Sequence, residues 1–170
     1  MVEIQGTIAS GRQIASKVFP DHPQELLRAA GYEVYPGTLN IHLRRPVRLA
    51  PMIPWQGPDD GRERFLVPAT LNGHRVHVNR WTGCPLERVD LIAPIRLRDA
   101  LGLNDGDEVT LHVDRSSVQA MSLAKWVLWL GRHPRPHELS VPSQVARNVV
   151  RSATAVIRAT PGLRGAARRL

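Results

Sequence analysis

The sequence predicts a mainly β fold: a small closed β-barrel with two short helices, followed by an α-helical C-terminal extension. Several short segments alternate between apolar and polar residues, as half-buried strands do. The dipeptide Asn72-Gly73 joins two of these segments, and Asn-Gly between alternating residues is a strong signal for a tight hairpin. Many short strands with few and brief helices favour a barrel over a layered α/β fold.

The N-terminal third is predicted to hold two strands and one helix. Residues 2–8 alternate and predict a strand. Asp21 is a favourable N-cap for a helix that Gly31 would end. Residues 39–43 alternate again and predict a half-buried strand. Residues 50–63 are rich in proline and glycine and predict a loop.

The next part of the chain predicts a hairpin, two further strands and the second short helix. The hairpin strands are expected at residues 65–71 and 74–81, and another apolar strand at 89–93. Proline is favourable in the first turn of a helix, so a short helix is expected over residues 94–101. Residues 109–113 place three apolar side chains on one face and predict the last strand.

The positive charge of the chain is concentrated in its C-terminal part. Residues 1–115 hold 14 Lys and Arg against 14 Asp and Glu, and residues 116–170 hold 9 against 1, which together give the 23 and 15 of the whole chain and its net charge of +8. We therefore expect a neutral barrel domain over residues 1–115 and a basic helical extension over 116–170.

Helices are expected in this extension at residues 118–130 and 143–159, the second with an arginine stripe opposite a valine and isoleucine stripe. Three interpretations of the extension stay open: packing on the barrel or on a second copy of the chain, binding to an anionic membrane surface, and contact with nucleic acid. Nucleic acid is the least favoured, because no aromatic residues alternate with the arginines, and no nucleic-acid partner is expected.

Cysteine content and the N-terminus bear on the compartment. The single cysteine, Cys84, excludes an internal disulfide and fits a reducing environment. The first residues lack the basic and apolar regions of a signal peptide, so none is expected, and the longest apolar stretch is interrupted by Ser122 and Lys125. A cytoplasmic protein is expected.

The pentapeptide Pro36-Gly37-Thr38-Leu39-Asn40 carries the clearest chemical signal. Residues two apart on an extended chain share a face, so Thr38 and Asn40 offer a hydroxyl and an amide oxygen to one cation. Magnesium prefers oxygen ligands and keeps positions free for phosphate oxygens when few protein groups hold it. The pentapeptide therefore favours a magnesium site used in phosphoryl transfer over a plain turn.

Four segments together resemble the archaeal-type CTP-dependent riboflavin kinases. They are Gly6-Thr7-Ile8-Ala9-Ser10-Gly11, residues 31–40 with the Tyr-Pro-Gly-Thr-Leu-Asn string, Leu91-Ile92-Ala93-Pro94-Ile95-Arg96-Leu97-Arg98, and Leu103-Asn104-Asp105-Gly106-Asp107. The resemblance implies a six-stranded Greek-key barrel of the cradle-loop, riboflavin-kinase-like type. It also implies transfer of the γ-phosphoryl group of CTP to riboflavin, with Mg²⁺, giving FMN and CDP.

The resemblance assigns roles by motif. Thr38 and Asn40 would hold magnesium, Thr82 and Glu87 would face the flavin, and Glu87 would be the catalytic carboxylate. The residues implied to bind the nucleotide are Gly11, Arg12, Gln13, Ile14, Ala15, Ser16, Lys17, Arg96, Leu97, Arg98 and Asp99.

One segment departs from the family pattern. Gln13 and Ala15 stand where the family has glycines, and each added Cβ restricts the backbone that approaches the nucleotide. The donor therefore stays open between CTP and another nucleoside triphosphate. A second functional hypothesis also stays open: a non-catalytic barrel that binds a flavin or nucleotide, or that regulates by binding DNA.

Overall fold

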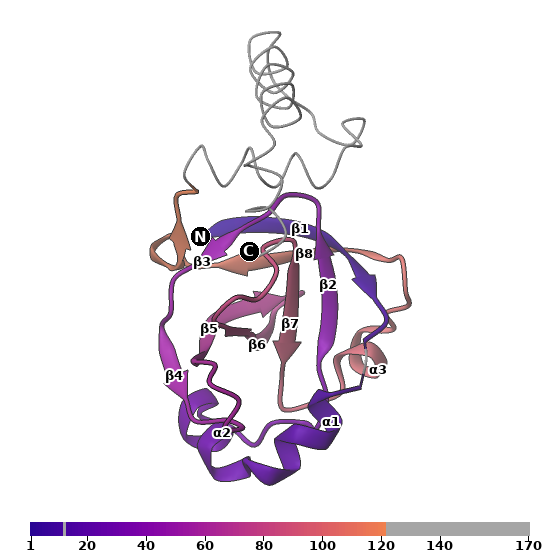
Figure 1. Cartoon of the computed structure of the whole chain (residues 1–170). Helices are drawn as coiled ribbons and strands as arrows, with labels where there is room; N and C mark the ends of the chain where they lie inside the picture. The colour runs from indigo at the N-terminus through magenta and orange to yellow at the C-terminus, as the bar shows by residue number, and fades with distance from the viewer. Residues whose placement is uncertain (12, 122–170) are drawn as a thin grey trace, which may run out of the picture. The chain divides into compact units, whose positions relative to one another are not determined.

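The computed structural model describes residues 1–11 and 13–121, which form a closed antiparallel β-barrel (Figure 1). Six strands run around it in the order β5-β6-β7-β2-β1-β8, and β8 pairs with β5 to close the ring. These strands are β1 (Val2–Ala9), β2 (Leu39–Leu43), β5 (Arg64–Leu71), β6 (His74–Trp81), β7 (Arg88–Ile92) and β8 (Glu108–Val113). The prediction of a mainly β, closed six-stranded barrel is confirmed.

Short elements surround the barrel. They are α1 (Ala15–Val18), the 3-10 turn η1 (Phe19–Asp21), α2 (Pro23–Ala30), β3 (Arg48–Leu49), β4 (Ile53–Trp55), α3 (Leu97–Leu101), the 3-10 turn η2 (Arg115–Ser117) and β9 (Val118–Gln119). In Figure 1, α1 and α2 lie together at one end of the barrel, near β4. Among the described residues, the helices are too short to cross a membrane.

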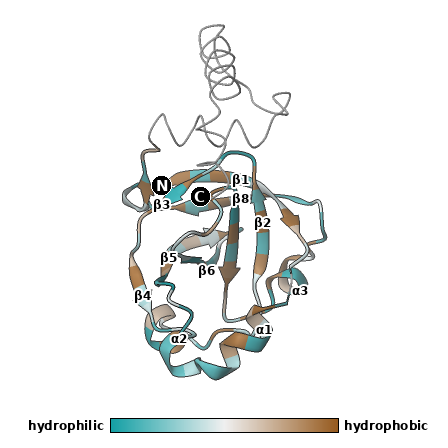
Figure 2. Cartoon of the chain, viewed as in Figure 1, coloured by the Kyte–Doolittle hydropathy of each residue, from teal (hydrophilic) through white to brown (hydrophobic). Residues whose placement is uncertain are grey.

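The buried apolar residues form two clusters, one on each side of the barrel wall. The interior cluster fills the barrel with side chains that include Val67, Leu91 and Leu111. The second cluster lies on the outer face, where Leu66 and Ile92 meet side chains from α2 and β4. Figure 2 shows hydrophobic and hydrophilic residues alternating along β1 and β2. This alternation is why the strand positions were readable from the sequence.

The predicted hairpin and the end of the first helix are confirmed, and both depend on positive φ angles. Asn72 (φ 48°) and Gly73 (φ 80°) both adopt the left-handed conformation that a two-residue type I′ turn requires. Gly31 (φ 73°) follows α2 in the same conformation, and its N–H donates to the carbonyl of Leu27.

Two predicted helix starts are displaced in the structure. Asp21 lies in η1 and does not cap α2; Pro23 occupies the first helical position instead and sets the start. The second helix begins at Leu97 rather than Pro94, because Arg96 keeps an extended backbone with ψ 100°.

Two other predictions are wrong at the edges of the barrel. The loop expected over residues 50–63 contains β4, a strand that pairs only with β5 and so tolerates Pro54. The helix expected from Val118 is wrong at its start, where Val118–Gln119 form β9 and pair with β3. Asp114 causes the change of direction, because its carboxylate accepts a hydrogen bond from the N–H of Ser116. From residue 122 onward the predicted extension lies outside the described residues.

A buried polar pair attaches the segment after α2 to the barrel. The hydroxyl of Tyr32 is 2.8 Å from Nδ1 of His77 on β6, and it also donates to the carbonyl of Ile92. The guanidinium of Arg75 lies 5.6 Å from the centre of the Tyr32 ring. His77 is only 1% exposed, so this contact fixes where the chain turns towards Gly37 and Thr38.

Burial of His77 predicts a loss of stability in mild acid. Desolvation, followed by the charge of Arg75, lowers the pKa of His77 from 6.5 to about 4. The folded state therefore opposes protonation: the contribution is intact above pH 6.5 and is lost as pH falls towards 4. Between pH 7 and pH 5 this one group should cost about 2 kcal/mol of unfolding free energy.

Urea unfolding at the two pH values measures this effect. His77→Gln keeps a polar partner for Tyr32 but does not titrate, so it should show a pH dependence smaller by that amount. Equal pH dependence in the two proteins would mean that His77 does not drive the acid sensitivity.

Candidate functional site

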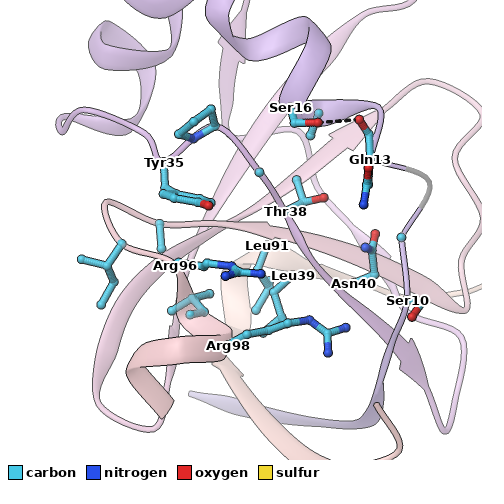
Figure 3. A pocket seen from close by; sticks show the side chains of 17 residues that line it. Ser10, Gln13, Ser16, Tyr35, Thr38, Leu39, Asn40, Leu91, Arg96 and Arg98 are labelled. Carbon is cyan, nitrogen blue, oxygen red and sulfur yellow. Dashed lines mark hydrogen bonds between the residues drawn. The ribbon is translucent and has the colours of Figure 1, made fainter. Parts of the chain in front are cut away.

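A pocket of about 570 Å³ lies at the ends of β1 and β7, between α1 and α3 (Figure 3). Its described lining residues come from four separate parts of the chain, between residues 10 and 16, 35 and 40, 91 and 93, and 95 and 98. Its described lining is Ser10, Gly11, Gln13, Ala15, Ser16, Tyr35, Pro36, Gly37, Thr38, Leu39, Asn40, Leu91, Ala93, Ile95, Arg96, Leu97 and Arg98. We call it the donor pocket, because it gathers most of the residues predicted to bind the nucleotide and both predicted metal ligands.

Two arginines line the donor pocket, and each pairs with a carboxylate outside the lining: Arg96 with Asp99 and Arg98 with Asp105. No Asp or Glu is among its described lining residues. Figure 3 shows the Arg98 side chain on the same side of the pocket as Asn40, with Thr38 nearby. Arginine side chains with hydroxyl and amide groups are suited to a polyphosphate, which carries several negative charges and many acceptor oxygens.

Asn40 sits where β2 meets its neighbours, opposite Ala9 on β1 and Asp90 on β7. Its side chain is 5% exposed and lies directly over Gly11. A Cβ at Gly11 would come within 2.2 Å of the Asn40 amide nitrogen, so a larger residue at this position would displace the Asn40 side chain. The Ser-Gly at the end of β1 and the Thr-Leu-Asn motif therefore depend on each other.

A guanidinium holds the Asn40 amide in place. Arg88 Nη2 donates to Asn40 Oδ1 at 3.0 Å, and Arg88 Nε donates to Asp90 Oδ1 at 3.0 Å. The Asp90 side chain is 10% exposed and neutralises most of the arginine charge. An amide oxygen has two lone pairs, so Asn40 Oδ1 retains one for another ligand.

A second polar network fixes the opposite wall. Arg98 Nη2 donates to the carbonyl of Ala9 at 3.0 Å and pairs with Asp105 at 2.5 Å, and the Ser10 hydroxyl donates to the same carboxylate. The hydrogen bonds from Ser10 and then Arg98 lower the pKa of Asp105. This network joins the end of β1, the start of α3 and the turn before β8.

The segment that departs from the family pattern keeps a glycine-like backbone at one position. Gln13 has φ 55°, in the region that glycine adopts freely and other residues rarely enter. The Ser16 hydroxyl donates to the carbonyl of Gln13 at 2.7 Å and stabilises this turn (Figure 3). Ala15, by contrast, begins the short helix α1 and needs no glycine.

Substitutions at Gln13 should show how much unfolding free energy its positive φ angle costs. Gln13→Gly relieves about 1 kcal/mol of left-handed strain, offset by the greater entropy of the unfolded chain, so stability should rise by no more than about 1 kcal/mol. Gln13→Val places a β-branched residue there and should destabilise by about 1–2 kcal/mol. Urea unfolding of the matched pair measures both, and equal stability of the two variants would contradict the assignment of strain.

Several predicted site residues lie outside the donor pocket. Ile14, Lys17 and Asp99 are exposed and do not line it, and Asp99 instead pairs with Arg96 at 3.1 Å. Arg12 lies outside the described residues.

The two predicted flavin residues lie in the connection between β6 and β7. Thr82 is exposed, and its hydroxyl is 3.5 Å from the carbonyl and from the carboxylate of Glu63. Glu87 is half-buried, accepts a backbone hydrogen bond from Leu43 and immediately precedes Arg88. Neither lines the donor pocket.

Arg88 and Asp90 were missed by sequence reasoning. The segment predicted at residues 89–93 did not include Arg88, whereas in the structure both residues lie on β7, two apart and so on one face. The register that sets Asp90 opposite Asn40 joins strands 50 residues apart in the chain, and nothing local specifies it. Ser10 was also missed, although it directly precedes Gly11 within the quoted motif.

Comparison with known proteins shows the family of this chain. Residues 17–113, more than half of the chain, match the model of the CTP-dependent riboflavin kinase family, which carries the description "Domain of unknown function DUF120".

Three curated relatives are named riboflavin kinase. The protein from Methanothermobacter thermautotrophicus is 33% identical over 119 residues, covering 62% of this chain and 90% of that protein. The protein from Pyrobaculum calidifontis is 35% identical over 104 residues, covering 51% and 47%. The protein from Methanosarcina acetivorans is 26% identical over 134 residues, covering 70% and 56%. The chain thus spans about half the length of the last two.

The matched region contains the Thr38 and Asn40 corner, both arginines of the donor pocket and the β6–β7 connection. With a family match over more than half of the sequence, and a relative of which it covers nine tenths, the chain belongs to the CTP-dependent riboflavin kinase family.

Proposed function

We propose that this chain is a riboflavin kinase that transfers the γ-phosphoryl group of CTP to the terminal ribityl hydroxyl of riboflavin, giving FMN and CDP. One observation carries the proposal: Thr38, Asn40, Arg96 and Arg98 line one pocket whose described lining holds no carboxylate. The family membership and the names of the relatives supply the substrates. The barrel is accordingly proposed to be of the Greek-key, cradle-loop type.

The residues present fit a magnesium ion. Thr38 and Asn40 offer neutral, hard oxygens, and the remaining lone pair of Asn40 Oδ1 is available for a ligand. With so few protein ligands, most of the coordination would come from phosphate oxygens and water. When bound, the ion would neutralise charge on the phosphates and orient them.

The protein groups then position the donor and acceptor. Arg96 and Arg98 are proposed to bind phosphate oxygens, and the close approach of Gly11 to Asn40 shapes the floor of the pocket. Phosphoryl transfer depends mostly on positioning and charge neutralisation, so a fixed cationic wall suits it.

Thr82 and Glu87 are proposed to bind the ribityl end of the flavin. Glu87 would orient the attacking hydroxyl and accept its proton as the bond to phosphorus forms. The position of Glu87 beside Arg88, which reaches Asn40, supports this role by linking the β6–β7 connection to the donor pocket.

A donor survey tests the proposal. Purified protein is incubated with riboflavin, Mg²⁺ and each of CTP, ATP, GTP and UTP, and FMN is measured by chromatography. We expect FMN with CTP and a much lower rate with the others. The absence of FMN with every donor would overturn the proposal, and FMN with ATP but not CTP would reassign the donor.

A further inference from the structure

A second pocket of about 200 Å³ lies between β6 and β7, beside the donor pocket. Its described lining is Asn79, Arg80, Trp81, Cys84, Pro85, Arg88 and Asp90, and we call it the β6–β7 pocket. Neither Thr82 nor Glu87 lines it, so the roles assigned above leave it unexplained.

Arg80 is a buried cation without a carboxylate in ion-pair contact. It is 3% exposed, and its Nη1 donates to the carbonyl of Arg88 at 2.5 Å. Within residues 1–11 and 13–121, none of the ion pairs found involves Arg80. Burial lowers the pKa of this arginine despite the opposing effects of Cys84, Asp90 and Glu87. Because a guanidinium stays protonated in proteins, Arg80 keeps its charge, and among the described residues Asp90 and Glu87 offset it only from beyond ion-pair distance.

Arg88 adds a second guanidinium to the same pocket. Its Nε and Nη2 contact Asp90, and Nη2 also contacts Asn40, a residue of the donor pocket. The described lining of the β6–β7 pocket thus holds two arginines against one aspartate. The strand register also connects the two pockets, because Asp90 lies opposite both Asn40 on β2 and Asn79 on β6.

We propose that the β6–β7 pocket is an oxyanion site that binds a phosphate group through the guanidiniums of Arg80 and Arg88. Arginine presents parallel N–H groups that match phosphate oxygens, and hydrogen bonds between charged partners strengthen away from water. The phosphate belongs either to a flavin monophosphate or to free inorganic phosphate. The assignment to flavin monophosphate rests on the proposed function, whereas the oxyanion site itself does not.

The flavin source has a geometric argument in its favour. Arg88 reaches Asn40 with one nitrogen and lines the β6–β7 pocket, so the two sites lie within the span of one side chain. A phosphate ester formed at the donor pocket would have this second cationic site next to it. Trp81 and Pro85 offer apolar surface to the carbon atoms that an ester carries.

Titration of the full chain with inorganic phosphate, followed by NMR of the arginine Nε–H groups, tests the site directly. We expect the Arg80 and Arg88 signals to shift. Arg88→Gln should weaken phosphate binding at the site about tenfold or more, as hydrogen bonds to charged groups imply. Asp90→Asn removes the only carboxylate of the described lining and should tighten binding about three- to tenfold.

Arg115→Gln is the matched control. Arg115 is exposed and lines neither pocket, and its removal changes the net charge by the same one unit as Arg88→Gln. It should leave phosphate binding unchanged. Arg80→Lys, which retains the charge, should bind more weakly than wild type and serves if Arg80→Gln does not fold.

Flavin binding identifies the source of the phosphate. If FMN binds at least about tenfold more tightly than riboflavin, and Arg88→Gln removes the difference, the occupant is the flavin phosphate. Equal affinities for FMN and riboflavin, together with shifts of the Arg80 and Arg88 signals caused by inorganic phosphate, would assign the site to the free anion.

Two results would overturn the oxyanion site: phosphate shifts confined to Arg96 and Arg98, or unchanged phosphate affinity in both Arg88→Gln and Asp90→Asn. These outcomes are independent of catalysis. Phosphate shifts at Arg80 in a protein that makes no FMN would retain the site and reject the kinase proposal.

Discussion

Replacing Asn40 by alanine is expected to lower kcat/KM for FMN formation by about two to three orders of magnitude. The amide oxygen is one of two proposed protein ligands to magnesium, and it also accepts a hydrogen bond from Arg88. Its loss would remove the proposed ligand and release the Arg88 guanidinium from its contact with Asn40. Initial rates over a magnesium titration measure the effect, and excess Mg²⁺ should restore part of the rate.

Matched variants separate ligand loss from packing. Asn40→Asp keeps an oxygen towards both Arg88 and the metal and should retain most of the activity. Thr38→Val keeps the shape of the side chain without the hydroxyl and should behave like Asn40→Ala, whereas Thr38→Ser should be close to wild type. Wild-type rates in Asn40→Ala and Thr38→Val would remove both residues from the site.

Glu87→Gln is expected to lower kcat by about 10²- to 10⁴-fold, the range that a general base contributes. The substitution is nearly isosteric and keeps the backbone hydrogen bond that Glu87 accepts from Leu43. Because the carboxylate is proposed to act on the attacking hydroxyl, the KM for CTP should change little. Steady-state rates with both substrates varied in turn give this separation.

Glu3→Gln is the control for the Glu87 prediction, since Glu3 is an exposed carboxylate on β1 that lines neither pocket. It should keep kcat within about twofold of wild type, as surface changes away from the chemistry usually do. Equal rates for Glu87→Gln and wild type would exclude Glu87 as the base.

Local signals predicted most of the barrel. Each hairpin or strand with a short-range marker was placed correctly, as with Asn72 and Gly73, whose positive φ angles the sequence predicts. The elements that were missed have no such marker. Strand β4 contains Pro54, which opposes a strand assignment by itself, and it exists because β5 offers an open edge. Strand β9 depends on its pairing with β3, where Gln119 lies opposite Arg48, 71 positions earlier in the chain.

The site residues likewise divide into those with a local sequence signal and those without one. Thr38 and Asn40 were predictable because they are two apart in a segment expected to be extended, and the structure places both in the donor pocket. The contribution of Arg88 was not predictable, because its partner Asn40 is 48 positions away and the contact exists only once β2 and β7 pair. Gln13 shows the reverse case: its departure from glycine was visible in the sequence, but its positive φ was not.

Transfer of a labelled phosphoryl group tests the central proposal most directly. CTP carrying ³²P in its γ position is mixed with riboflavin, Mg²⁺ and excess protein, and the products are separated after a single turnover. The account predicts that the label appears in FMN and that Asn40→Ala slows its appearance. Label that stays in CTP, or that is released only as inorganic phosphate, would contradict it.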